Sequence, residues 1–263
     1  MNKVLLIIPA YNEEDCILST VKKIINYNKK AKLKLDYIVI NDGSKDGTED
    51  ILQDNNINHI RLIQNLGIGG AVQTGYKYAL EKGYDIAVQY DGDGQHDVSY
   101  VENLIKPIIQ GKANMTIGSR FIEGSISKFK SSAARRLGIK IISSCIKLKT
   151  NIKIYDTTSG FRAVDSKIIK DFVNNYPPEY PEPISTVNVL LDGYKVREIP
   201  VSMNERTTGK SSINSWKNAY YMINVILSIL IMKRGNWYEY EFEIKNSYLS
   251  IFYYLDMWCF LFS

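Results

Sequence analysis

Short apolar runs separated by polar loops are the main pattern in the first half of the chain. The runs predict buried strands at residues 4–8, 37–40, 60–63, 86–90 and 115–118. Helical periodicity follows the loop after the first strand, with Ile17, Val21 and Ile24 on one face of the predicted helix. Strand, loop and helix, repeated in this order, are typical of an α/β fold with an open, mostly parallel sheet flanked by helices.

The fourth predicted strand leads into two carboxylates, Asp91 and Asp93, with glycines beside them. At a strand end, where glycine lets the backbone turn, both side chains can converge on one point. Such a pair suits a hard divalent cation, Mg²⁺ or Mn²⁺, which keeps coordination positions for water and substrate phosphates. The pattern predicts a nucleoside-diphosphate substrate, although an acidic, glycine-rich loop can also be a simple turn. A calcium loop is excluded because His96 stands where that loop needs glycine and a strand precedes it.

Three other polar loops, at residues 11–14, 41–44 and 65–70, follow the first three predicted strands. Because ligands bind such sheets outside the carboxyl ends of the strands, these loops should line one edge together with the two carboxylates. We also expect Asn12 to cap the first helix. Residues 67–70 lack the full glycine fingerprint of a dinucleotide site, which disfavours NAD, although their backbone amides can approach a phosphate.

The net charge of +5 is spread unevenly along the chain. Residues 124–155 include eight basic side chains and no acidic one. This run is either a solvated face or a contact surface for an anionic partner, such as a phosphate or a phospholipid surface. No nucleic-acid recognition module is visible. Three cysteines, far apart and without metal spacing, and an N-terminal apolar run too short for a signal peptide indicate a cytoplasmic protein.

The second half predicts a helix at 133–148, a shaped proline-rich loop at 176–183 and an edge strand at 196–201. Residues 219–232 are apolar apart from Asn224 and Ser228, and these fourteen residues are too few to span a bilayer, which needs about 20. A core helix and an interfacial helix both remain open for this stretch. The aromatic residues of 247–263 predict either a membrane-seeking tail or a poorly specified terminus.

The chain resembles glycosyltransferase family 2, with the GT-A fold, and within it the polyprenyl-phosphate branch that includes dolichol-phosphate mannose synthases. The matching motifs occur in family order at residues 8–14, 41–48, 65–75, 91–96, 118–121, 156–162 and 206–211. The resemblance implies a glycosyltransferase domain at 1–217, divided into a nucleotide-sugar half (1–117) and an acceptor half (118–217). An apolar segment at 218–263, with a possible association with the membrane, would follow. One departure is that Leu137, Gly138 and Ile139, with no serine among them, follow the arginine pair of the acceptor helix.

The resemblance also implies roles for individual residues. The nucleotide would contact Pro9, Ala10, Tyr11, Glu13, Asp42, Gly67, Gly69 and Asp91. A divalent metal ion would be held by Asp91, Asp93 and Gln95. The acceptor phosphate or the donor diphosphate would meet Arg120, Arg162 and Arg206.

Three hypotheses about function follow. The first is an inverting, metal-dependent transfer of a sugar from a nucleotide, with UDP as the expected nucleotide, to undecaprenyl or a similar polyprenyl phosphate for cell-envelope glycan synthesis. A phosphate acceptor is already anionic and needs no general base. The second is transfer to a sugar hydroxyl of a cell-surface polysaccharide, with Glu182 or Asp156 as the base. The third, an inactive subunit that binds a nucleotide-sugar or a membrane partner, is disfavoured by the intact Asp91/Asp93 pair. We expect a peripheral protein at the cytoplasmic face of the membrane.

Overall fold

The computed structural model describes residues 2–92, 94–125, 133–202 and 215–232. Within them, one sheet of seven strands has the order β3-β2-β1-β4-β6-β5-β7. The strands are β1 (Val4–Ala10), β2 (Asp36–Asn41), β3 (His59–Arg61), β4 (Ile86–Gln89), β5 (Met115–Ser119), β6 (Arg162–Asp165) and β7 (Val196–Pro200). All neighbouring pairs are parallel except those that β6 makes with β4 and β5. The predicted α/β fold with a mostly parallel sheet is confirmed.

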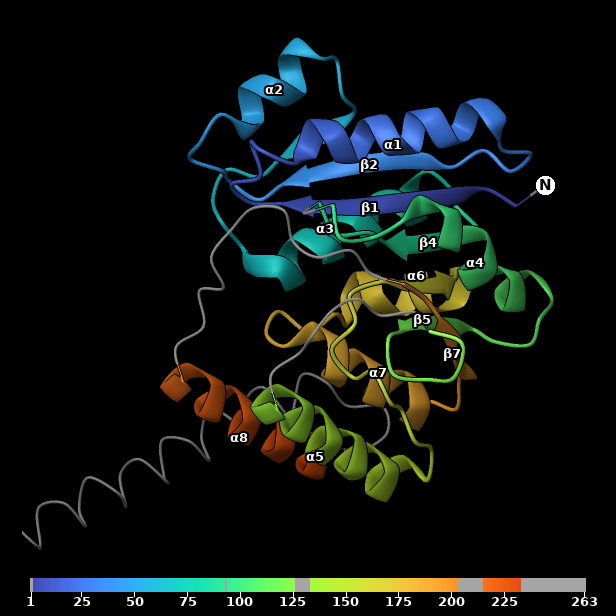
Figure 1. Cartoon of the computed structure of the whole chain (residues 1–263), viewed down its shortest axis with the longest axis vertical. Coiled ribbons are helices and arrows are strands. Elements are labelled where there is room, and N and C mark those ends of the chain that lie inside the picture. Colours follow the sequence, from blue (N-terminus) through green and yellow to red (C-terminus); the bar gives the residue numbers. More distant parts are fainter. Residues whose placement is uncertain (1, 93, 126–132, 203–214, 233–263) are drawn as a thin grey trace, which may run out of the picture.

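Helices cover both faces of the sheet (Figure 1). They are α1 (Ile17–Lys30), α2 (Thr48–Asp54), α3 (Gly67–Glu81), α4 (Val101–Ile109), α5 (Ala133–Thr150), α6 (Ser166–Asn174), α7 (Pro181–Leu191) and α8 (Ser215–Ile231), with a 3₁₀ turn at Val98–Tyr100. β1 is buried at every position, and its alternating side chains divide between two cores. Leu5 and Ile7 pack with α3 and α6, whereas Leu6 and Ile8 pack with α1, α2 and α4.

The short strand β6 was not predicted from the sequence. It contributes only two apolar residues, Ala163 and Val164, between a buried arginine and the aspartate that caps α6. Four residues without a clear period cannot be distinguished from a loop by pattern alone. This strand matters for the site, because its antiparallel direction pairs Arg162, at the start of β6, with Gln89, at the end of β4. The residues that precede β6 therefore lie beside the loop that follows β4.

Two local predictions were wrong. Asn12 does not cap α1, which begins at Ile17; its backbone has φ 56° and its side-chain oxygen accepts a hydrogen bond from the amide of Lys45 at 2.9 Å. The proline-rich loop is shorter than predicted, because α7 begins at Pro181. Proline is tolerated in the first turn of a helix, where its missing amide has no partner in any case.

The apolar stretch at 219–232 forms part of α8, which contacts α5 and α7. Val225 and Ile229 have no exposed surface and join the larger core, whereas Ile223 and Leu230 are 58% and 46% exposed. Among the residues that the structure describes, no helix is long and apolar enough to cross a membrane. Residues 247–263, for which the sequence predicts either a membrane-seeking tail or a poorly specified terminus, lie outside the described part of the chain.

Candidate active site

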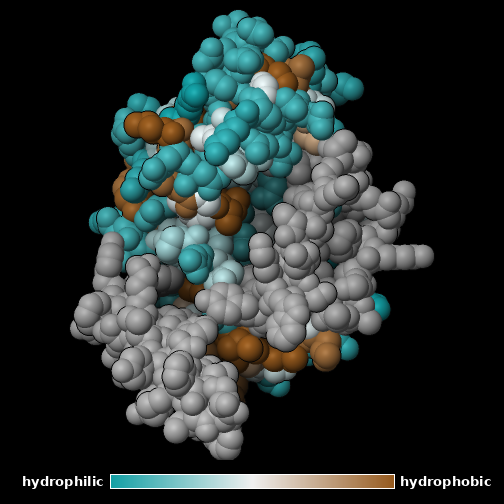
Figure 2. Space-filling model, turned by 90° about the vertical axis from the view of Figure 1, so that its left-hand side faces the viewer, coloured by the Kyte–Doolittle hydropathy of each residue, from teal (hydrophilic) through white to brown (hydrophobic). Residues whose placement is uncertain are grey.

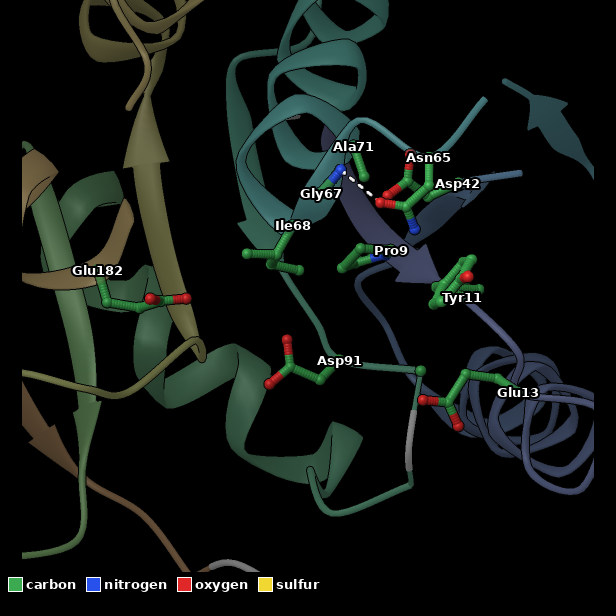
Figure 3. A pocket seen from close by; sticks show the side chains of 12 residues that line it. Pro9, Tyr11, Glu13, Asp42, Asn65, Gly67, Ile68, Ala71, Asp91 and Glu182 are labelled. Carbon is green, nitrogen blue, oxygen red and sulfur yellow. Dashed lines mark hydrogen bonds between the residues drawn. The ribbon is translucent and has the colours of Figure 1, made fainter. Parts of the chain in front are cut away.

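A cleft of about 590 Å³ opens at the carboxyl ends of three adjacent strands, β2, β1 and β4 (Figure 3). The register pairs Ala10 with Asn41 and Ile7 with Gln89, so the loops that follow these strands meet at one edge of the sheet. The cleft is lined by Pro9, Ala10, Tyr11, Glu13, Asp42, Asn65, Gly67, Ile68, Ala71, Asp91, Gly92 and Glu182. The structure therefore brings most of the predicted nucleotide-binding residues together. Gly69 is predicted for the same site but does not line the cleft.

Asp42 fixes one end of the cleft. Its amide donates to the carbonyl oxygen of Ala10 at 2.8 Å, and its Oδ1 accepts from the amide of Leu66 at 2.7 Å. These contacts tie the ends of β1 and β2 to the start of α3, where Gly67 donates to Asn65 Oδ1 at 3.0 Å (Figure 3). Burial raises the pKa of Asp42, and the amides of Leu66 and Gly67 oppose that rise.

Asp91 lies in the middle of the cleft, and one third of its side chain is exposed. His96 Nε2 lies 2.9 Å from its Oδ2, and the buried His96 ring stacks on Phe161 with 4.7 Å between centroids. The backbone of Gly160 passes close by, because a Cβ there would lie 2.9 Å from Asp91 Oδ2 and 3.0 Å from Oδ1. A side chain at position 160 would therefore displace the Asp91 carboxylate.

The donor atoms at this position fit a hard divalent cation. Asp91 presents carboxylate oxygens to an open cleft, and Gln95 lies in the loop that follows. Asp93, the second predicted metal ligand, lies outside the described residues. Within the described part of the chain, no group of three acidic, histidine or cysteine side chains is placed to hold a metal ion. The remaining positions of a cation at Asp91 would be left for Asp93, water and substrate oxygens.

Asp156 and Arg120 form an enclosed pair. Arg120 Nε lies 2.8 Å from Asp156 Oδ2, its Nη2 lies 2.8 Å from Oδ1, and its amide also donates to Oδ2 at 3.0 Å. Asp156 has no exposed surface. Both carboxylate oxygens are thus engaged by Arg120, and the expectation that Asp156 acts as a base in the cleft is not met.

Arg162 is completely buried, and its guanidinium is surrounded by hydrogen-bond acceptors. Nε and Nη2 donate to the carbonyl oxygen of Ser159 at 3.1 and 2.9 Å. Nη1 donates to the carbonyl oxygen of Glu182 at 3.0 Å and to Ser185 Oγ at 2.9 Å. The structure therefore places Arg162 beneath the site rather than on the lining of the cleft. The third predicted arginine, Arg206, lies outside the described residues.

Glu182, in the first turn of α7, projects into the cleft from the side opposite Tyr11 and Asp42 (Figure 3). Burial raises the pKa of its carboxyl group and the charge of Asp91 adds to the rise, whereas the nearby Arg162 opposes it. Four of the twelve lining residues, Glu13, Asp42, Asp91 and Glu182, are acidic, and no described lining residue is basic.

Two features of the site were not predicted from the sequence. The sequence pattern excludes a calcium loop at His96 but does not predict that this side chain, five residues after Asp91, contacts the Asp91 carboxylate. Gly160 belongs to the motif at 156–162, but nothing in that motif indicates a contact with Asp91. Its approach to Asp91 depends on the antiparallel strand β6, which no local pattern indicated.

A comparison with protein families identifies the family to which the chain belongs. The model of glycosyl transferase family 2 matches residues 5–172, so the chain belongs to this family. The resemblance inferred from the motifs is confirmed, and the protein is a glycosyltransferase.

Two curated relatives of the chain are also named as glycosyltransferases. The chain is 35% identical over 250 residues to the UDP-N-acetylglucosamine–dolichyl-phosphate N-acetylglucosaminyltransferase of Methanococcus voltae, covering 88% of this chain and 96% of the relative. It is 26% identical over 233 residues to the undecaprenyl-phosphate mannosyltransferase of Micrococcus luteus, covering 85% and 92%.

A solved structure of glucosyl-3-phosphoglycerate synthase from Mycobacterium tuberculosis, in complex with Mn²⁺, UDP-glucose and phosphoglyceric acid, shares the fold. Its TM-score is 0.63 at 18% identity, covering 87% of this chain and 79% of that one. Another structure of that synthase contains Mg²⁺ and UDP.

Proposed function

We propose that this protein transfers a sugar from a nucleotide diphosphate, UDP in the first instance, to a polyprenyl phosphate. The observation that carries the proposal is the convergence of three strand ends on one cleft, with Asp42 at one end and Asp91 at its centre. Asp42, Pro9 and Tyr11 would hold the nucleoside. Asp91, with Asp93 and Gln95, would hold a divalent cation against the diphosphate. The relatives from M. voltae and M. luteus, whose names specify polyprenyl phosphates as acceptors, support the choice of acceptor.

In this reaction, an oxygen of the acceptor phosphate attacks the anomeric carbon while the bond from that carbon to the diphosphate breaks. In-line attack from the opposite face inverts the anomeric configuration. Negative charge develops on the leaving diphosphate, and a bound divalent cation would supply positive charge there. The acceptor phosphate is anionic near neutral pH, so the transfer requires no general base.

The lower end of the molecule offers a surface for a lipid acceptor. α5 and α8 contact one another at the lower end of Figure 1, and Figure 2 shows apolar surface at the same end of the molecule. The exposed apolar residues of these two helices include Leu137, Ile141, Leu148, Ile223 and Leu230. These residues, and the basic residues that the sequence carries in 124–155, support the proposal that the protein attaches peripherally to an anionic membrane or to a membrane partner subunit.

A product assay tests the proposal. Purified protein is incubated with Mg²⁺ or Mn²⁺, a radiolabelled nucleotide-sugar and either undecaprenyl phosphate or an undecaprenyl-diphosphate-linked sugar. We expect label in a lipid product with undecaprenyl phosphate only, and release of that label by mild acid. Label transferred only to the lipid-linked sugar would overturn the proposal and favour a hydroxyl acceptor, with Glu182 as its base.

A further inference from the structure

Glu182 is not required as a general base when the acceptor is a phosphate, yet its carboxylate projects into the cleft. It faces the space beside Asp91 and lies across the cleft from Asp42 (Figure 3). A carboxylate in such a position needs an explanation, because burial raises the pKa of Glu182 and therefore makes its ionised form costly for the fold.

The buried guanidinium of Arg162 holds the first turn of α7 in place. It donates to the carbonyl oxygen of Glu182 and to Ser185 Oγ, at 3.0 and 2.9 Å. Ser185 Oγ also donates to the carbonyl oxygen of Pro181, and Thr186 Oγ1 donates to that of Glu182 at 2.7 Å. The backbone of Glu182 is therefore fixed by side chains that have no exposed surface themselves.

The segment that leads into α7 is fixed as well. Tyr180 has φ 52°, a left-handed conformation that is uncommon for a residue with a side chain and concentrates at functional sites. The preceding prolines lie directly on the first turn of α3, because a Cβ at Gly69 would be 2.3 Å from the carbonyl oxygen of Pro177 and 2.4 Å from that of Pro178. Gly69 thus permits the close approach that joins the start of α7 to the cleft edge of α3.

We propose that Glu182 binds hydroxyl groups of the transferred sugar and thereby selects which sugar is used. The inference rests on the proposed nucleotide-sugar donor. With the nucleoside at Asp42 and the diphosphate at Asp91, the sugar extends past Asp91 into the part of the cleft that Glu182 faces. An ionised carboxylate offers two acceptor oxygens to adjacent ring hydroxyls, which are donors. Losing a hydrogen bond to a half-buried carboxylate oxygen is costly, so a sugar without the matching hydroxyl is bound more weakly.

Calorimetric binding without an acceptor tests this assignment. Wild type, Glu182→Gln and Glu182→Asp are titrated, with Mn²⁺ present, with UDP and with UDP-glucose, UDP-galactose, UDP-N-acetylglucosamine and GDP-mannose. For the donor that wild type binds best, we expect Glu182→Gln to weaken affinity about 10- to 100-fold, as for one lost hydrogen bond to a charged group. Affinity for UDP should change less than about 3-fold, because UDP lacks the sugar. Deoxy analogues of the same donor, each without one sugar hydroxyl, allow a double-mutant cycle with Glu182→Gln. The analogue that lacks the hydroxyl contacted by Glu182 should bind wild type and variant with equal affinity.

Glu179→Gln is the matched control, because Glu179 is exposed, lies three residues earlier and does not line the cleft. It should leave all affinities unchanged, and thermal unfolding should show that every variant is folded. Equal affinity of wild type and Glu182→Gln for the intact donor would overturn the inference while leaving the proposed function standing. An equal loss for UDP and for the donor would overturn it too, because Glu182 would then act on the nucleotide. If wild type binds none of the nucleotide-sugars, the proposed function fails and the inference falls with it. The acceptor has no part in these titrations, so an error about the polyprenyl phosphate cannot produce any of these results.

Discussion

Replacing Arg162 by lysine distinguishes an internal anchor from a ligand of substrate phosphates. The guanidinium donates four hydrogen bonds at 2.9–3.1 Å, two to Ser159 and one each to Glu182 and Ser185. Lysine keeps the charge but lacks the planar fork of donors, and its ammonium cannot reach all of these acceptors. Losing two or three buried bonds from a charged donor should lower the free energy of unfolding by about 3–5 kcal/mol.

Urea denaturation followed by circular dichroism measures this loss. We expect the midpoint to fall without a large change in slope, because the surface exposed on unfolding stays similar. Since domains are stable by only about 5–15 kcal/mol, ligand binding should be measured at low temperature, where the variant is still folded. Under those conditions the affinity for UDP should remain within about 3-fold of wild type, because Arg162 does not line the cleft.

Arg197→Lys serves as the control, because Arg197 is exposed on β7 and should tolerate the same chemical change within about 0.5 kcal/mol. The reasoning is refuted if Arg162→Lys unfolds at the wild-type urea concentration yet loses tenfold or more in UDP affinity. That result would mean that the guanidinium turns toward the substrate.

Four further outcomes are expected. Asp93→Asn should reduce turnover by two or more orders of magnitude with the fold intact, and full activity of wild type in excess chelator would contradict the predicted metal dependence. Asp42→Ala should weaken UDP binding by about 1–3 kcal/mol in calorimetry, and unchanged affinity would count against its place at the nucleoside. In flotation assays the protein should bind anionic vesicles and be partly released by high salt, at about 1 kcal/mol for each engaged basic residue, whereas indifference to all vesicles would rule out the membrane surface. Because the pKa of Glu182 is raised in the folded state, its stabilising contribution is present below about pH 4.5 and is lost as the pH rises through the folded value. The unfolding free energy of Glu182→Gln relative to wild type should therefore increase with pH above that point, and parallel curves would refute the assignment.

The position of the cleft can be predicted from the sequence because parallel neighbouring strands have their carboxyl ends at the same edge of the sheet. Once the runs at 4–8, 37–40 and 86–90 are recognised as neighbouring strands, the loops that follow them must meet at one edge. The contacts of Asp42 with Ala10 and Leu66 agree with this expectation, since they join the ends of β1 and β2 to the start of α3.

The wall formed by β6 and α7 could not be predicted in the same way. Its position depends on an antiparallel strand of four residues and on a buried arginine, and neither has a period. The sequence alone does not indicate whether an arginine in a motif contacts a substrate phosphate or donates hydrogen bonds inside the protein. The hydrogen-bond acceptors around Arg162, three of them on α7, show that its guanidinium donates inside the protein.

The charge of the cleft leads to a conclusion about how a diphosphate can bind there. Of the twelve lining residues, Glu13, Asp42, Asp91 and Glu182 are acidic and none of the described ones is basic. Arg120, a predicted phosphate ligand, is held by both oxygens of Asp156. A dianionic diphosphate would be repelled by these carboxylates unless positive charge accompanies it. A divalent cation bound at Asp91 would supply such charge next to the diphosphate. We therefore expect UDP affinity to depend steeply on Mn²⁺ or Mg²⁺, and an affinity that stays the same in excess chelator would contradict this conclusion.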